Sequence, residues 1–340
     1  MRILVLVAHN EHPHNYGVDY LIDGFREVCG AENVLEWPEK NCLHLAPGQP
    51  RDACNIDSDA WWPSKGEINV QEWAETADLV VLGDVIDEVE TTIRAANVLR
   101  VVPISTPVLA LDMSDYPWNR VEEYQRITDR PLIYAKRELP IGETWAIPCP
   151  LTYPASKIPH PMPAKMPKVV YHATHHADFP PGIPRMAIVA ALQAHPHIPP
   201  SALDVALYPS QQNRPTPEEY HAKMARGLVG IAFNGAPNWD NNRFSEGLAH
   251  GLCQVSERPR IEYPHPYQHL RHVCWIDTAD QVAPMVAALI NNPTWALSIA
   301  NAGHEHFKQY HCSAARARYL LQRIGLMKEV ENGGTERIAG

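Results

Sequence analysis

The sequence predicts an α/β protein built from two Rossmann-like, doubly wound domains that face each other across a cleft. One observation is the length of 340 residues, about twice the 150-residue length typical of one domain. Another is the repeated alternation of short apolar runs with amphipathic segments, which favours parallel sheets with crossover helices. The third is the proline-rich stretch 153–167, which lacks apolar periodicity and is expected to link the two halves.

The first half, residues 1–152, is expected to form the N-terminal domain. Its first apolar run, 3–7, is short and rich in branched side chains, as in a strand buried on both faces. Leu21, Phe25 and Val28 lie on one face of a helix expected over 18–30. Further strands are expected at 33–37, 77–82, 107–111, 131–135 and 145–148, helices at 88–99 and 120–127, and a long polar loop at 41–66.

The same pattern restarts after the linker, and residues 168–310 are expected to form the C-terminal domain. Strands are expected at 168–173, 203–208, 230–233, 252–256 and 273–276. Helices are expected at 185–192, 217–228, 245–250 and 280–290, and a helical tail at 294–324 with a break near His311. The part of this tail after the break, residues 311–328, is expected to form a separate C-terminal helix, and the last residues, 329–340, are expected to fray.

Charge is distributed unevenly along the chain. The formal net charge is −10, with 12 Lys/Arg against 25 Asp/Glu in residues 1–150 and 17 against 14 in residues 151–340. The N-terminal half therefore carries −13 and is expected to repel polyanions, whereas the C-terminal half carries +3 and tolerates a phosphorylated ligand.

Several classes of protein are excluded by composition. The first apolar run is too short for a signal peptide, and no stretch approaches the roughly 18 apolar residues of a membrane span. Seven cysteines form no C-x-x-C pair, and their number is odd. We therefore expect free thiols and a cytoplasmic location rather than a disulfide framework.

Common nucleotide and hydrolase motifs are absent from the sequence. It contains no G-x-x-x-x-G-K-[ST] phosphate loop, no G-x-G-x-x-G fingerprint, no G-x-S-x-G elbow and no H-E-x-x-H helix. A histidine cluster, His172, His175 and His176, lies where a predicted strand ends and a loop begins, with no carboxylate at helical spacing to complete a metal site. Loop, ligand-contacting or packing roles are favoured over metal binding, and we expect no metal.

The segment 241–251, with the sequence NNRFSEGLAHG, is the most informative part of the chain. A short helix is expected from Ser245, just after the strand at 230–233, where a free helix N-terminus suits phosphate. Arg243 adds a guanidinium fork for phosphate oxygens, and Glu246 could accept hydrogen bonds from a ribose diol. The alternative interpretation is a surface ion pair between Arg243 and Glu246.

This segment resembles the R-x-x-E-x-x-A-x-G signature of GT-B glycosyltransferases, especially the spore-maturation CgeB-like group. The signature letters are Arg243, Glu246, Ala249 and Gly251. The similarity is clear over 230–325, weaker over 168–230, and in the first half rests on Gly17, Asp115-Tyr-Pro and the IPCPLTYP run. It implies the GT-B fold, transfer of a sugar from a nucleotide-diphosphate donor without cofactor or metal, and a tail that packs back on the first domain.

The resemblance also assigns expected donor-site residues. Asn238 stands where many retaining enzymes of this fold carry a second glutamate, so the stereochemical outcome stays open. The nucleotide base of the donor is expected to bind near Tyr208, at the end of a strand. The full set of expected donor-binding residues is Gly17, His172, His175, Arg185, Tyr208, Asn238, Arg243, Ser245 and Glu246.

The acceptor side must supply a base if the transfer inverts configuration. Asp115 is the first candidate, since it follows a strand and matches the family's Asp-x-Pro, and His14 is the second. The alternative for Asp115 is an N-cap or Asx turn before the helix at 120–127.

The acceptor is expected to be neutral or cationic: a saccharide, a small molecule or a protein side chain. A modified base in DNA is disfavoured by the −13 charge of the first half. Four tryptophans of this half could stack on sugar rings or bases or pack in the core: Trp61, Trp62, Trp73 and Trp118. Two other functions stay open: a non-catalytic nucleotide-sugar-binding protein and a sugar-nucleotide epimerase of the same fold.

Overall fold

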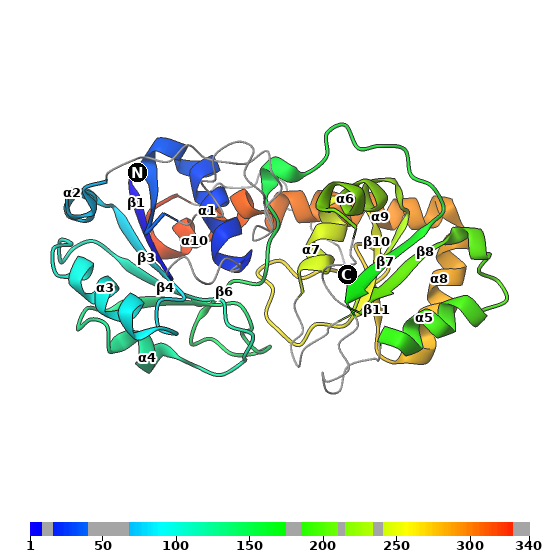
Figure 1. Ribbon diagram of the computed structural model, residues 1–340, viewed down its shortest axis with the longest axis horizontal. Coiled ribbons are helices and arrows are strands. Elements are labelled where there is room, and N and C mark those ends of the chain that lie inside the picture. The colour runs from blue at the N-terminus through cyan, green and yellow to red at the C-terminus, as the bar shows by residue number, and fades with distance from the viewer. Residues whose placement is uncertain (9–15, 40–67, 175–184, 210–214, 234–240, 329–340) are drawn as a thin grey trace, which may run out of the picture.

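The computed structural model of the protein describes residues 1–8, 16–39, 68–174, 185–209, 215–233 and 241–328. It contains two parallel sheets side by side, each with helices on both faces (Figure 1). This architecture confirms the predicted α/β class with two doubly wound halves.

The N-terminal sheet has six strands in the order β2-β1-β3-β4-β5-β6, and every pairing is parallel. Its central strands are buried along their whole length, as their continuous apolar sequences predict. The strands are β1 (Ile3–Val7), β2 (Val34–Trp37), β3 (Leu79–Gly83), β4 (Val108–Asp112), β5 (Leu132–Lys136) and β6 (Ile147–Pro148). The helices are α1 (Tyr16–Cys29), α2 (Val70–Thr76), α3 (Val89–Leu99) and α4 (Val121–Gln125).

The C-terminal sheet has five strands in the order β11-β10-β9-β7-β8, again all parallel. Its strands are β7 (Val169–Thr174), β8 (Leu203–Tyr208), β9 (Val229–Ala232), β10 (Cys253–Glu257) and β11 (Cys274–Ile276). The helices that follow the linker are α5 (Arg185–Ala194), α6 (Pro217–Arg226), α7 (Asn242–Ala249), α8 (Val282–Asn291), α9 (Pro293–Tyr310) and α10 (Ser313–Ile324).

Both sheets have the same winding. In each, the first strand lies between the second and the third in chain order. The order in which strands are added to the sheet therefore reverses between β1 and β3 and between β7 and β9. Ligands of open α/β sheets bind at the carboxyl ends of the strands at such a switch point. The fold therefore directs attention to the segments after β1, β3, β7 and β9.

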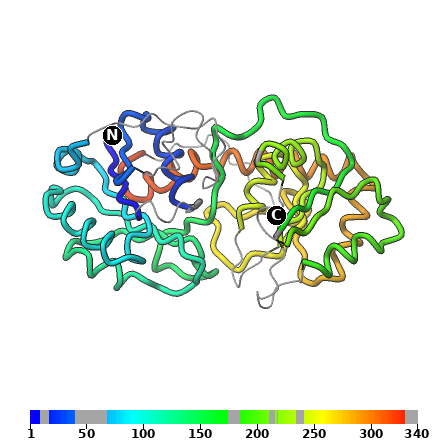
Figure 2. The backbone as a smooth tube through the Cα atoms, viewed as in Figure 1, coloured from blue at the N-terminus to red at the C-terminus, as the bar shows by residue number. Residues whose placement is uncertain are grey.

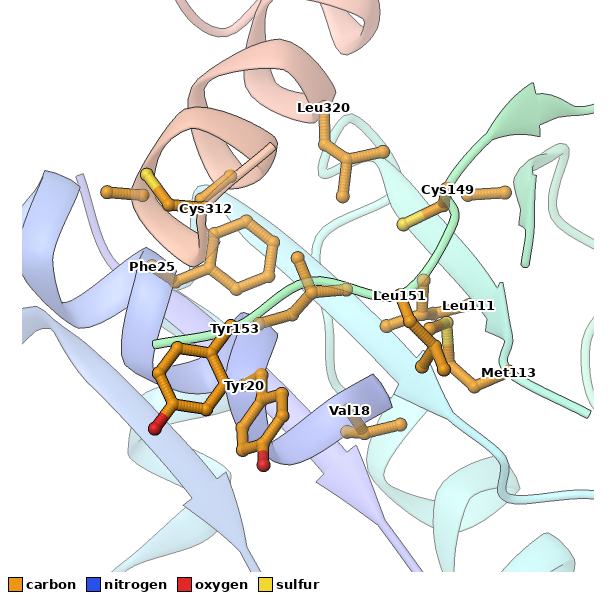
Figure 3. Packing of buried hydrophobic residues seen from close by; sticks show 14 of the residues in the cluster. Val18, Tyr20, Phe25, Leu111, Met113, Cys149, Leu151, Tyr153, Cys312 and Leu320 are labelled. Carbon is orange, nitrogen blue, oxygen red and sulfur yellow. The ribbon is translucent and has the colours of Figure 1, made fainter. Parts of the chain in front are cut away.

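Helix α10 returns to the N-terminal half and packs on α1 (Figures 1 and 2). The two helices come so close that a Cβ on Gly24 would lie 2.2 Å from the backbone oxygen of Ser313. Figure 3 shows Cys312 and Leu320 on one side of this contact and Phe25 and Tyr153 on the other, in one continuous core. This contact joins the end of the chain to its beginning.

The carboxyl edges of the two sheets face each other. The segment after β5 pairs with the segment after β10: the Ile141 amide donates to the Arg260 carbonyl at 3.2 Å, and the Glu262 amide donates to the Leu139 carbonyl at 2.8 Å. The segments that follow the carboxyl ends of these two strands are thus in direct contact.

Some elements differ from the expectations. Helix α7 begins at Asn242, three residues before the expected Ser245, because the Asn241 side chain accepts a hydrogen bond from the Phe244 amide and caps the helix there. Helix α2 was not expected. Its cap is Asn69, which accepts from the Glu72 amide.

Two further expectations can be compared with the described part of the chain. The loop at 41–66 lies outside it. Among the described residues, no helix is both long and apolar enough to cross a membrane. The five described cysteines are free thiols.

Candidate active site

Helix α7 follows β9 at the switch point and places Arg243 in its first turn. The Arg243 guanidinium is half-buried. Its Nη2 is 3.5 Å from the Phe233 carbonyl, and its Nε is buried without a hydrogen-bond partner among the described residues. A buried donor without a partner costs about 1–3 kcal/mol. Such a group is typical of a site that is completed by a ligand.

The charge of Arg243 is not neutralised by any described carboxylate. Glu246 lies one turn later in α7, but the two side chains form no ion pair. The interpretation of Arg243 and Glu246 as a surface ion pair is therefore wrong. A half-buried cation at a helix N-terminus attracts an anion, because the guanidinium and the helix dipole act in the same direction.

A second arginine reaches the same region. Arg185 is the first residue of α5, which follows β7 at the other side of the switch point. Burial raises the pKa of the Tyr171 hydroxyl, and the positive charges of Arg243 and Arg185 oppose that shift. Both guanidinium groups therefore act on the same hydroxyl, whose oxygen is buried and has no hydrogen-bond partner in the part of the chain that the structure describes.

His172 and Tyr208 form a second cluster at the ends of β7 and β8. The parallel register places His172 opposite Ala206, between Asp204 and Tyr208 on one face of the sheet. The imidazole Nε2 donates to Asp204 Oδ1 at 2.9 Å, and the Tyr208 hydroxyl donates to Nδ1 at 2.7 Å. The Lys223 ammonium also donates to Asp204 Oδ1, at 2.9 Å. The arrangement fixes the ring of Tyr208.

The protonation state of this cluster follows from its surroundings. Burial lowers the pKa of His172, more than the hydrogen bond to Asp204 raises it. Burial raises the pKa of Asp204, but hydrogen bonds from Lys223 and His172 outweigh it, so that the pKa is lowered. At neutral pH the histidine is therefore uncharged and the aspartate ionised. This state agrees with Nε2 of His172 donating to Asp204 and Nδ1 accepting from Tyr208.

Glu246 connects the two clusters. The hydroxyl of Tyr220, from α6, donates to Glu246 Oε2 at 3.5 Å, and the Tyr220 ring packs edge-on against His172. Arg243, Glu246, His172 and Tyr208 thus lie along one edge of the C-terminal sheet, as the sequence predicted.

Two expected residues have evident packing roles. The Ser245 hydroxyl donates to the Leu151 carbonyl at 3.2 Å and so ties α7 to the chain that leaves the first sheet. A Cβ on Gly17 would lie 2.3 Å from Cε of Met113, so glycine lets the first turn of α1 pack on the segment after β4. Donor binding by these two residues stays a prediction.

Asp115 lies on the acceptor side, three residues beyond β4. Its carboxylate forms an ion pair with Arg137 and is about half exposed. Arg120 is the N-cap residue of helix α4, and in the Asx-type bond before the helix the Val121 amide donates to Asn119 Oδ1. The interpretation of Asp115 as an N-cap or Asx-turn residue of this helix is therefore wrong.

Three predicted residues, His14, His175 and Asn238, lie outside the described residues, as does His176 of the possible metal cluster. Within the described ranges, no three His, Cys, Asp or Glu side chains are grouped as metal ligands.

Sequence reasoning missed Tyr171, Asp204, Tyr220 and Lys223. Asp204 had a signal, since it shares the alternating face of β8 with Tyr208, but its partner could be identified only from the register with β7. Tyr220 and Lys223 lie on helix α6, which the sequence predicted without indicating a role for either side chain. Their contacts depend on how α6 packs over the sheet.

Part of the C-terminal half matches a known family. Residues 190–322 match the model of a family described as glycosyl transferase-like. No curated protein matches the chain.

Solved structures match nearly the whole chain at low sequence identity. HepE of Anabaena, solved with UDP and glucose, is 10% identical with a TM-score of 0.56, covering 96% of this chain and all of its own. An alpha-glucosyltransferase solved with UDP-glucose and DNA containing an abasic site is 12% identical with a TM-score of 0.57, covering 96% and 99%. A glycosyltransferase from Rickettsia africae is 10% identical with a TM-score of 0.55, covering 97% and 99%. At these identities the likeness establishes the two-domain GT-B fold.

Proposed function

We propose that this chain, which has the GT-B fold and matches a glycosyl transferase-like family over residues 190–322, is a nucleotide-sugar-dependent glycosyltransferase. It would transfer a sugar from a UDP donor to a hydroxyl group of an acceptor. We take residues 168–310 as the donor domain, residues 1–152 as the acceptor domain, and 153–167 as their linker. Segment 311–328 is the tail that packs back on the acceptor domain. UDP is preferred among nucleotides because HepE and the alpha-glucosyltransferase were solved with it.

The observation that carries the proposal is the Arg243 guanidinium, which is half-buried at the start of α7 and has no carboxylate partner among the described residues. A diphosphate would supply the missing acceptors, and Arg185 and the Tyr171 hydroxyl lie within electrostatic reach. Such groups stabilise the departing diphosphate without a metal ion. No cofactor is required beyond the donor substrate.

The remaining edge of the sheet suits the nucleoside. Tyr208, held by His172, offers a fixed aromatic ring for the base. Glu246 offers carboxylate oxygens to the ribose diol. We propose that Asn238 and His175 extend the phosphate site and that Ser245 and Gly17 shape it.

The transfer forms a bond between the acceptor oxygen and the anomeric carbon and breaks the bond from that carbon to the β-phosphate of UDP. The electron pair of the broken bond leaves with UDP. In an inverting reaction the acceptor proton passes to a carboxylate, and Asp115 is our candidate for it, with His14 second. The ion pair with Arg137 engages Oδ1 of Asp115 and orients the carboxylate.

We propose a cytoplasmic location. The free thiols of the described cysteines support it, since a reducing compartment maintains this state.

Two substitutions separate donor binding from chemistry. We expect Glu246→Ala to weaken UDP binding about tenfold, because a carboxylate that accepts from the ribose diol is lost. We expect Asp115→Asn to lower kcat at least about a hundredfold with little change in the dissociation constant for UDP. Calorimetry measures binding, and release of UDP from UDP-sugar in the presence of acceptor measures turnover.

Glu305 provides a matched control, since it is an exposed carboxylate on α9 that pairs with Lys308. Glu305→Ala is expected to leave the affinity for UDP unchanged. Equal effects of Glu246→Ala and Glu305→Ala on that affinity would remove Glu246 from the donor site.

A further inference from the structure

Two aromatic rings are stacked on the surface of the acceptor domain. Tyr116 and Trp118 lie almost parallel, at 12°, with ring centroids 4.2 Å apart. Both side chains are unusually open to solvent for their size, with Tyr116 46% and Trp118 55% exposed. Burying large aromatic surface is favourable, so an exposed stacked pair is typical of a binding surface. We call these two residues the aromatic platform.

The segment that carries the platform is held firmly to the carboxyl edge of the sheet. The Met113 amide donates to Asp84 Oδ1 at 3.0 Å, and the amide and hydroxyl of Ser114 both donate to Asp112 Oδ1. The hydroxyl of Ser114 in turn accepts from Lys136 at 2.8 Å. A platform positioned in this way loses little conformational entropy when a ligand stacks on it.

Planar polar groups lie beside the platform in the chain. Asp115 immediately precedes Tyr116 and is paired with Arg137. Arg120 follows Trp118 by two residues and is paired with Asp87 at 2.5 Å. Both arginines are neutralised by carboxylates, so this surface offers oriented hydrogen-bonding groups without excess positive charge.

We propose that the aromatic platform binds the acceptor and that the acceptor is a neutral saccharide. One face of a pyranose ring is apolar and stacks on an aromatic ring, while its hydroxyls hydrogen-bond to carboxylate and guanidinium groups. This inference rests on the proposed function and specifies its acceptor.

The charge of the surface selects a saccharide over nucleic acid. Bases also stack on aromatic rings, but nucleic-acid sites add unpaired Lys and Arg for the phosphates. Here the arginines are paired, Glu122 and Glu123 follow, and residues 1–150 carry −13. Asp115 immediately precedes Tyr116, so the platform and the proposed base belong to the same short segment after β4.

The test measures acceptor use by wild type and by variants of Trp118. Maltose, cellobiose, lactose and N,N′-diacetylchitobiose are supplied with UDP-glucose, and UDP release is followed. We expect at least one saccharide to stimulate release. Trp118→Ala should raise its KM about five- to tenfold, whereas Trp118→Phe, which retains a stacking ring, should stay within about twofold of wild type.

The matched control is Ile104→Ala, which removes a side chain 80% exposed in the same domain and should change nothing. An unchanged KM in Trp118→Ala, no stimulation by any saccharide, or stimulation by duplex DNA instead would each overturn the proposal. Calorimetric titration with UDP accompanies each variant. Absence of UDP binding by the wild-type protein would contradict the proposed function. UDP binding without use of any saccharide would contradict only the proposal that the aromatic platform binds a saccharide acceptor.

Discussion

Replacing Arg243 by alanine is expected to raise the dissociation constant for UDP about 30- to 100-fold. The estimate corresponds to about 2–3 kcal/mol, the range for hydrogen bonds from a charged group to a ligand phosphate. The guanidinium has no described counter-ion, and its Nε is buried without a partner. Its removal therefore leaves no carboxylate unpaired, and the thermal stability of the free protein should not fall. Calorimetric titration and a melting curve measure the two quantities.

Two controls sharpen this experiment. Arg258→Ala removes an exposed arginine of the same domain that pairs with Asp277, and it should leave the UDP affinity unchanged. Titration with uridine, which lacks the diphosphate, should give the same affinity for wild type and Arg243→Ala. A loss of uridine binding as large as the loss of UDP binding would show that Arg243 supports the fold of the site rather than the phosphates.

Replacing Lys136 by methionine is expected to destabilise the protein by about 3–5 kcal/mol. Lys136 and Asp112 are both fully buried, and Nζ lies 3.0 Å from Asp112 Oδ2. Burial lowers the pKa of Lys136, and the nearby Asp112 charge opposes this. Without the lysine the carboxylate is left as a buried charge held only by hydrogen bonds from Tyr134 and Ser114. Urea unfolding, followed by fluorescence, measures the loss.

The double variant Asp112→Asn/Lys136→Met tests the reason for this effect. It removes both charges, so it should be more stable than Lys136→Met alone, by about 1–3 kcal/mol. A double variant no more stable than Lys136→Met would contradict the ion-pair explanation and assign the effect to packing of the lysine stem.

The fold was predictable because its signals are local. Short apolar runs such as Ile3–Val7 and Leu79–Gly83 can be buried on both faces only in a parallel sheet covered by helices. Sequence signals for the ends of helices and strands predicted the bounds of most elements to within a few residues. The exception that bears on the site is α7, whose cap Asn241 precedes the expected start and puts Arg243 inside the helix.

The candidate site was predictable in part. Arg243, Glu246, His172 and Tyr208 follow strands at one edge, and chain order alone places them near a switch point. Their partners could not be found in the same way. Asp204 meets His172, and Asp112 meets Lys136, because of the register between neighbouring strands. That register depends on the packing of the whole sheet.

Calorimetric titration of the wild-type protein with UDP tests most directly whether the edge formed by α7, β7 and β8 binds this nucleotide. We expect saturable binding at one site per chain that Arg243→Ala weakens and Arg258→Ala does not. Absence of saturable binding of UDP would contradict the proposed donor site.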